Sequence, residues 1–146
     1  MQSHELNLDQ LNDWVKRFCS NLSNKQLVLL SGPLGAGKTE LVKKILQNFG
    51  CDEVNSPTYG LIHEYAVPNR ENVFHVDLYR IEDGEDLESS GFWDLFDKDQ
   101  GLIFVEWADQ LPESQWPLHW ELVSIKIDKV EGKDTRLYNV HASSHN

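Results

Sequence analysis

The stretch that decides the fold of this chain is Ser31-Gly32-Pro33-Leu34-Gly35-Ala36-Gly37-Lys38-Thr39. Gly32, four intervening residues and then Gly37-Lys38-Thr39 have the spacing of a phosphate-binding loop. An apolar run precedes the loop and an amphipathic segment follows it, so the loop joins a strand to a helix. Glycines let backbone N–H groups turn toward an anion, and the N-terminus of the helix adds a partial positive charge. The stretch therefore predicts a nucleotide phosphate site formed by residues 32–39.

Two oxygen-bearing side chains are candidates for binding Mg²⁺ beside the phosphates. In a phosphate-binding loop the lysine, here Lys38, reaches the β- and γ-phosphates, and the next hydroxyl, here Thr39, binds the metal. Such proteins also hold the metal with an acid at the end of a neighbouring hydrophobic strand. Glu106 follows the apolar run 102–105, which is typical of a strand buried on both faces. We therefore predict that Lys38 contacts the phosphates and that Thr39 and Glu106 bind the metal.

Asp77 is a second acid that follows a β-rich run. Residues 73–76 alternate in polarity, which is typical of a strand outside the central sheet. The carboxylate fits two roles about equally well, namely positioning of a metal or water and a salt bridge with the nearby Arg80. His75, in the same run, is interpreted as a core histidine.

A turn-rich segment after the loop's helix contains Ser56-Pro57-Thr58. A hydroxyl-bearing loop at this point of the chain can act as a switch that senses the γ-phosphate, with Pro57 holding Thr58 in a turn. An ordinary turn accounts for the same three residues. Tyr59 and Trp107 are candidates for stacking on a base, although aromatic side chains more often belong to the core.

Hydrophobic periodicity predicts the other elements. Apolar residues at three- and four-residue spacing predict helices over residues 7–22 and 39–49, with Asn7 as the N-cap of the first and Gly50 ending the second. The expected β-structure is an antiparallel hairpin of residues 61–67 and 73–79 around a turn at 68–72, and two half-exposed strands at 122–127 and 136–140. The last six residues are polar and are expected to be frayed.

Composition narrows the possible functions. The 146 residues fit one domain, 1–146, and no apolar run approaches the roughly 20 residues that span a bilayer. The net charge is −11 with 13 Lys and Arg residues, so we expect no strong direct binding of tRNA. Cys19 and Cys51 lack metal-binding spacing, which predicts two small core residues in a reducing cytoplasm.

Four segments follow one another in a recognisable order: Leu34-Gly35-Ala36-Gly37-Lys38-Thr39, Ser56-Pro57-Thr58-Tyr59, His75-Val76-Asp77-Leu78-Tyr79-Arg80 and Glu106-Trp107. In this order and spacing they resemble the TsaE (YjeE) family, small bacterial ATPases needed to make threonylcarbamoyladenosine in tRNA. The resemblance covers about residues 5–127 and implies a P-loop NTPase-like α/β fold in three layers, with a mainly parallel central sheet and added antiparallel strands. It implies ATP and Mg²⁺ as ligands, with Thr39 and Glu106 near the metal, Thr58 as the switch threonine and Asp77 in the active site.

The resemblance also implies partners similar to the TsaD and TsaB proteins, and an adenine pocket near residues 5–10. Three positions depart from the family's usual pattern: Pro33 stands where Asp is usual, Gly60 stands where Thr is usual, and Trp107-Ala108-Asp109 replaces a Trp-Pro-Glu-like stretch. None of them removes a phosphate or metal contact. A chain of this acidity would leave the tRNA chemistry to a partner.

Other readings of a phosphate-binding loop remain open from the sequence. A small-molecule kinase needs a lid with arginines, whereas this chain has four arginines and no clustered pair. A GTP-dependent switch usually carries Asn-Lys-x-Asp late in the chain, and the Asn24-Lys25 pair precedes the loop without that Asp. A nucleotide-gated binding module without hydrolysis is the third alternative.

Overall fold

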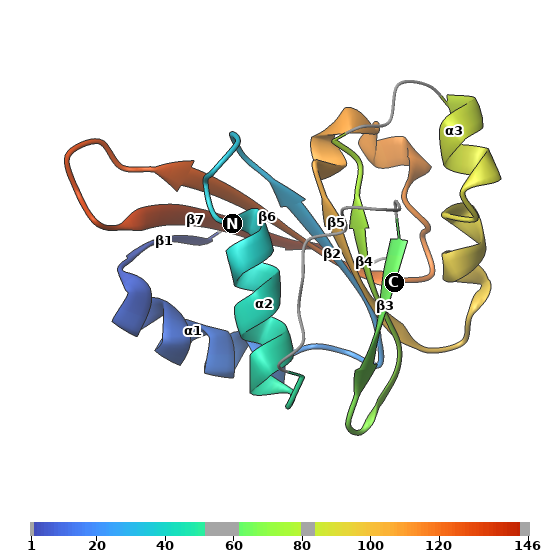
Figure 1. Ribbon diagram of the computed structural model, residues 1–146, viewed down its shortest axis with the longest axis horizontal. Coiled ribbons are helices and arrows are strands. Elements are labelled where there is room, and N and C mark those ends of the chain that lie inside the picture. The colour runs from blue at the N-terminus through green and yellow to red at the C-terminus, as the bar shows by residue number, and fades with distance from the viewer. Residues whose placement is uncertain (1, 52–61, 80–83, 144–146) are drawn as a thin grey trace.

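The computed structural model describes residues 2–51, 62–79 and 84–143. Within them, one mixed sheet has the strand order β1-β7-β6-β2-β5-β4-β3 (Figure 1). The strands are β1 (Gln2–Leu6), β2 (Lys25–Ser31), β3 (Ile62–Val67), β4 (Arg70–Asp77), β5 (Gly101–Glu106), β6 (Glu121–Lys129) and β7 (Arg136–Ser143). The central strands β6, β2, β5 and β4 run parallel, and the outer strands pair antiparallel. The expected fold class is thereby confirmed.

Helices on both faces of the sheet give the molecule three layers (Figure 1). One face carries α1 (Leu8–Ser20) and α2 (Lys38–Asn48), and the other carries α3 (Gly84–Ser89) and the 3₁₀ helices η1 (Trp93–Asp97), η2 (Ala108–Gln110) and η3 (Glu113–Gln115). A hydrophobic core fills each interface, and alternate residues of β2 enter the two cores. This follows because successive side chains of a strand point to opposite faces. None of the helices described is long and apolar enough to cross a membrane.

Strand β4 lies inside the sheet, which corrects the expectation that Asp77 follows a strand outside it. β4 pairs in parallel with β5, and residues 73–76 are all buried. The polar member of this run, His75, is 0% exposed and bonds to the side chain of Glu106. A polar residue in a strand therefore does not indicate exposure when a partner inside the protein satisfies it. β5 is buried along its whole length, as expected from its continuous apolar run.

The hairpin of β3 and β4 is confirmed, but its turn is shorter than expected. Pro68 and Asn69 alone separate the two strands. Asn69 has a φ of 64°, a left-handed conformation that asparagine adopts more readily than most residues. Asn72, which belongs to the expected turn, lies within β4, and its side-chain amide donates to the carbonyl oxygen of Gln100 at 2.9 Å. Because its side chain has this partner, Asn72 lies within β4 although it belongs to the polar segment expected to form the turn.

The edge formed by β1 and β7 differs most from expectation. The sequence pattern does not predict β1, because Gln2-Ser3-His4-Glu5 has no apolar periodicity. β1 nevertheless pairs antiparallel with β7 and places His4 opposite Tyr138. β7 continues to Ser143, so half of the segment expected to be frayed pairs with β6 instead. Both differences arise from pairing between distant parts of the chain.

The helix ends follow the predicted capping chemistry. At the start of α1, the Asn7 side chain accepts from the Gln10 N–H and the Gln10 side chain accepts from the Asn7 N–H, each at 2.9 Å. α2 ends at Asn48 with Phe49 as its C-cap, and Gly50 follows directly with a φ of 92°, as expected for a glycine that terminates a helix. Cys19 and Cys51 are buried and unpaired, and burial raises the pKa of the Cys19 thiol to about 11. This confirms their role as small core residues.

Candidate nucleotide-binding site

The predicted phosphate-binding loop connects β2 to α2 with its glycines in left-handed conformations. The φ angles are 138° at Gly32, 79° at Gly35 and 113° at Gly37, a region that residues with a Cβ atom rarely adopt. At Gly32 a Cβ atom would also lie 2.2 Å from the backbone oxygen of Ile127 in β6. The start of the loop is therefore held against β6, and this close approach requires glycine.

The helix that follows the loop has an N-terminus that is open to an anion. α2 begins at Lys38 after Gly37, and no side chain caps it, in contrast to the capping box of α1. The first backbone N–H groups of a helix have no partner within the helix. Within the loop, Ala36 is fully buried, whereas Leu34 is 71% exposed. The amides at the start of α2 can therefore bind a phosphate.

Lys38 is buried and braces the loop. Its Nζ donates to the carbonyl oxygens of Gly32 at 2.7 Å and Pro33 at 3.0 Å, and lies 4.0 Å from the centre of the Trp107 ring. Burial lowers the pKa of this ammonium group, and nearby acids oppose that shift: Glu106, Asp109 and Asp77. An anion in the loop would stabilise the charge further, because a charged partner binds an ammonium more strongly than a neutral carbonyl does.

Thr39 and Glu106 meet where α2 begins and β5 ends, as the sequence predicts. The Thr39 Oγ1 lies 2.9 Å and 2.8 Å from the two carboxylate oxygens of Glu106. Glu106 is only 3% exposed, so its carboxylate depends on protein partners rather than on water. A hydroxyl and a carboxylate are the oxygen ligands that Mg²⁺ prefers. These two residues therefore fit the predicted metal.

A cation at this point would complete its shell with phosphate and water. Across the side chains described at residues 2–51, 62–79 and 87–142, no three His, Cys, Asp or Glu residues are grouped so as to hold a metal by themselves. Mg²⁺ in nucleotide sites typically combines a few protein oxygens with substrate phosphates and retained waters. The arrangement is thus suited to a metal that arrives with a nucleotide, not to a dedicated metal centre.

Asp77 ends β4 beside Glu106, because the two residues are direct partners in the parallel register of β4 and β5. Its carboxylate accepts a hydrogen bond from the Tyr79 backbone N–H at 2.9 Å. The structure therefore brings Asp77 to the same sheet edge as the metal candidates. Thr58 and Arg80 lie outside the described residues, so the switch role and the salt bridge stay predictions.

Trp107 covers Lys38 and has an unusual backbone conformation. Its φ is 60°, a left-handed conformation that is costly for a bulky residue and tends to persist where function requires it. The Tyr79 ring, half exposed, lies 4.8 Å from the Trp107 ring. The contact that the structure shows for Trp107 is with the lysine of the loop, and its stacking on a base stays a prediction. Tyr59 lies outside the described residues, so its stacking also stays a prediction.

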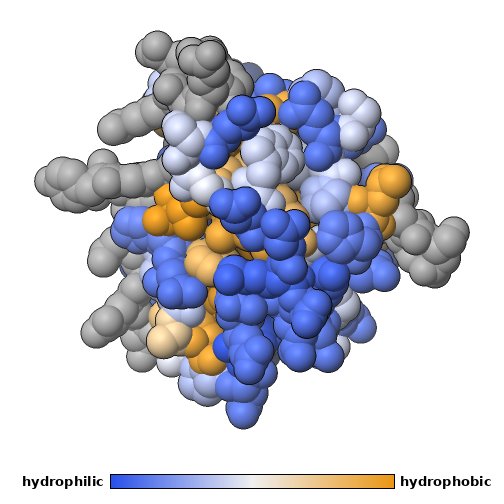
Figure 2. All heavy atoms as spheres, turned by 90° about the vertical axis from the view of Figure 1, so that its right-hand side faces the viewer, coloured by the Kyte–Doolittle hydropathy of each residue, from blue (hydrophilic) through white to orange (hydrophobic). Residues whose placement is uncertain are grey.

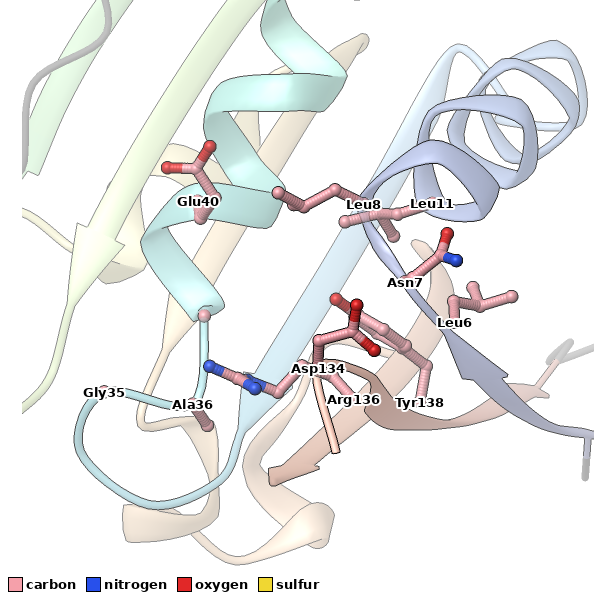
Figure 3. A pocket seen from close by; sticks show the side chains of 11 residues that line it. Leu6, Asn7, Leu8, Leu11, Gly35, Ala36, Glu40, Asp134, Arg136 and Tyr138 are labelled. Carbon is pink, nitrogen blue, oxygen red and sulfur yellow. The ribbon is translucent and has the colours of Figure 1, made fainter. Parts of the chain in front are cut away.

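A cavity of about 320 Å³ adjoins the phosphate loop (Figure 3). Its lining has an apolar part, formed by Leu6, Leu8, Leu11, Ala36 and Tyr138, and a polar part, formed by Asn7, Glu40, Asp134 and Arg136. Apolar walls with a few polar groups are typical of small-molecule sites. Leu6, Asn7 and Leu8 of this lining fall within the segment 5–10 that we expected near adenine, and Leu11 lies just beyond it.

Two cations beside the loop were missed by sequence reasoning. Figure 3 shows the Arg136 guanidinium directed toward the loop near Ala36. The Lys129 Nζ lies 3.4 Å from the position of a Cβ atom built on Gly35. Lys129 and Arg136 are cross-strand partners at the end of the β6–β7 hairpin. For Arg136, the one feature visible in the sequence was its two-residue spacing from Tyr138, which places both side chains on the same face of a strand.

A parallel-centred sheet, a glycine loop between β2 and α2, and a Thr–Glu pair at the strand ends define a P-loop NTPase-like protein. A family model described as "Threonylcarbamoyl adenosine biosynthesis protein TsaE" matches residues 6–137. The chain belongs to the TsaE family, which confirms the resemblance read from its motifs.

Individual relatives agree with this assignment. The tRNA threonylcarbamoyladenosine biosynthesis protein TsaE of Rickettsia prowazekii (strain Madrid E) is 33% identical over 141 residues, which cover 94% of this chain and 93% of that protein. The protein of the same name from Haemophilus influenzae (strain ATCC 51907 / DSM 11121 / KW20 / Rd) is 42% identical over 93 residues, covering 60% and 58% of the two chains. The crystal structure of Bacillus subtilis YdiB superimposes with a TM-score of 0.66 and 27% identity, over 97% of this chain and 86% of that one.

Proposed function

We propose that this protein binds ATP with Mg²⁺, hydrolyses ATP to ADP and phosphate, and uses this cycle on partner proteins in threonylcarbamoyladenosine modification of tRNA. The observation that carries the proposal is the junction of Lys38, Thr39 and Glu106 at the end of the phosphate-binding loop. The process is taken from the relatives in Rickettsia prowazekii and Haemophilus influenzae, which are both called tRNA threonylcarbamoyladenosine biosynthesis protein TsaE.

Polyphosphate binding would give Lys38 new partners. Its ammonium donates to two loop carbonyls, those of Gly32 and Pro33, and is therefore already placed at the inner side of the loop. Phosphate oxygens entering the loop would accept these hydrogen bonds and those of the free amides at the start of α2. The positive φ values of the loop glycines support the proposal, because backbones of this kind can turn their N–H groups toward an anion.

Thr39 and Glu106 would hold Mg²⁺ on the side of the loop that faces β5. When bound, Mg²⁺ neutralises charge on the β- and γ-phosphate oxygens during phosphoryl transfer. Asp77 stands beside Glu106 and has a carboxylate that can accept a proton from, or orient, an attacking water. Thr58 is proposed to sense the γ-phosphate. The nucleoside would occupy the cavity between α1, the loop and β7.

The distribution of charge favours action through partners. The net charge is −11, and Figure 2 shows that the face carrying α3 is largely hydrophilic. Acidic residues on the elements around it are exposed: Glu88, Asp94, Asp97 and Asp99. Such a surface repels the tRNA backbone. We therefore propose that TsaD-like and TsaB-like proteins contact the tRNA, and that this chain works on them in the cytoplasm.

Incubation of the purified chain with ATP tests the proposal directly. We expect magnesium-dependent binding of ATP and slow release of ADP and free phosphate. Transfer of the phosphate to a cosubstrate would instead establish the small-molecule kinase alternative. Tight binding without any turnover, with partners present, would establish the non-hydrolysing module. Preference for GTP over ATP would contradict the choice of nucleotide.

Arg136→Ala is expected to weaken nucleotide binding by roughly tenfold or more. The guanidinium lines the cavity and is directed toward the loop, and one hydrogen bond to a charged partner contributes about 1.5–3 kcal/mol. Calorimetric titration with ADP measures the change. Lys133→Ala is the matched control, because the Lys133 ammonium is 59% exposed and pairs with Glu5 at 3.5 Å. Equal affinities for the Arg136 variant and the parent would place the nucleotide elsewhere.

A further inference from the structure

His75 is a buried polar side chain to which the proposed reaction assigns no role. It is 0% exposed on β4, and its Nε2 bonds to the Oε2 of Glu106. An ionised carboxylate only accepts hydrogen bonds, so Nε2 must carry the proton. The other ring nitrogen, Nδ1, is buried and has no hydrogen-bond partner within the part of the chain described. The ring therefore directs its proton at Glu106.

We propose that His75 is a positioning residue that fixes the Glu106 carboxylate for the metal, an inference that rests on the proposed function. Thr39 contacts both carboxylate oxygens, whereas His75 contacts Oε2 alone. The two contacts come from different elements, α2 and β4, and together they prevent the carboxylate from rotating about its bond to the side chain. Oε1, which His75 does not contact, is thereby held at 2.9 Å from the Thr39 hydroxyl, on the side where the cation or its water would bind.

The surroundings explain why a donor is needed at this position. His75 and Glu106 point to the face of the sheet covered by α2. On this face their strand neighbours Val73 and Phe104 belong to the hydrophobic core beneath α1 and α2. A carboxylate that is 3% exposed in such a place needs hydrogen bonds from the protein. A lysine would carry a positive charge beside the metal at neutral pH, whereas an imidazole can donate a hydrogen bond without a permanent charge. Removing partners of this kind typically lowers metal affinity by roughly 10- to 100-fold.

The test uses metal binding rather than turnover. Mn²⁺ is titrated into the protein saturated with ADP, and free Mn²⁺ is measured by electron paramagnetic resonance; ADP affinity is measured separately in EDTA. His75→Leu should weaken Mn²⁺ binding roughly 10- to 100-fold and leave ADP affinity in EDTA unchanged. His75→Gln and His75→Asn form a matched pair, because the glutamine amide reaches the place of Nε2 and the shorter asparagine amide does not. We expect glutamine, but not asparagine, to restore Mn²⁺ binding to within about threefold of the parent. This difference tests the positioning role of His75 even if the leucine variant does not fold.

Two further variants calibrate the result. Glu106→Gln gives the loss expected when the ligand itself is changed, and Val73→Ala controls for loosening of β4 on the same face. Parental Mn²⁺ affinity in His75→Leu, equal effects of glutamine and asparagine, or an equal loss in Val73→Ala would overturn the positioning role while leaving the proposed function intact. If the parent itself binds ADP equally well with and without metal, the proposed function fails and the role of His75 fails with it.

Discussion

Lys38→Ala is expected to weaken ATP binding by roughly 100-fold or more while the fold survives. Hydrogen bonds between charged partners contribute about 1.5–3 kcal/mol each, and the ammonium has two placed at the loop, now made to the carbonyls of Gly32 and Pro33. Removing it leaves these carbonyls without their donor but also removes a buried charge. The two effects offset each other, so unfolding free energy should change by only about 1 kcal/mol.

Calorimetry with ATP and thermal unfolding together check this expectation. Lys44→Ala is the matched control, because it removes an ammonium from the same helix, where Nζ bonds to Asn12 at 3.0 Å on the surface. That variant should bind ATP as the parent does. Parental affinity in Lys38→Ala would show that residues 32–39 do not bind the phosphates. A large loss of stability would instead show that the lysine mainly supports the loop.

The second large effect is expected from partner proteins. The isolated chain should turn over on the order of 10⁻⁴ to 10⁻² times per second, and TsaD-like and TsaB-like proteins should accelerate it by up to about 10³–10⁵-fold. Phosphoryl transfer depends on cations around the γ-phosphate, and in related enzymes an arginine from a partner protein supplies one of these cations. Arg136 lines the cavity beside the loop, where the nucleoside is proposed to bind, and Lys129 lies near Gly35. Neither side chain is assigned to the γ-phosphate in the proposed mode of binding.

Phosphate release by the chain alone, with each partner, and with both partners measures this acceleration. Parallel reactions with Lys38→Ala show how much phosphate comes from this chain rather than from a contaminating ATPase. Fast turnover by the isolated chain that the partners leave unchanged would exclude partner control. It would favour an autonomous enzyme, such as the kinase considered from the sequence.

The parts of the site that could be predicted are those encoded by neighbours in sequence. The loop, its lysine and Thr39 are adjacent, and their spacing is fixed by the geometry of a strand–loop–helix unit. Glu106 could be placed because a continuous apolar run indicates a central strand, and parallel strands end at one edge. For the same reason Asn7 and Gly50 marked helix ends correctly, since capping is local chemistry.

The parts that could not be predicted depend on partners distant in sequence. β1 forms only because β7 supplies its hydrogen bonds, and the cavity wall with Arg136 and Tyr138 follows from that pairing. His75 made β4 look half exposed, because the sequence does not show that Glu106 lies within reach. The left-handed conformation of Trp107 has no sequence signal either, because a bulky residue rarely adopts it.

Because β1 pairs with β7, the part of the sheet that borders the cavity can form only after the C-terminal strand has been synthesised. Translation proceeds from the N-terminus, so β1, the phosphate loop and Thr39 leave the ribosome long before β7 does. A nascent chain that has reached residue 129 already contains Glu106, yet it lacks the cavity wall carrying Arg136 and Tyr138. Full affinity for the nucleotide would arise only after β7 has emerged and joined the sheet. Incomplete translation products would therefore bind the nucleotide weakly and would take little part in the proposed ATP cycle.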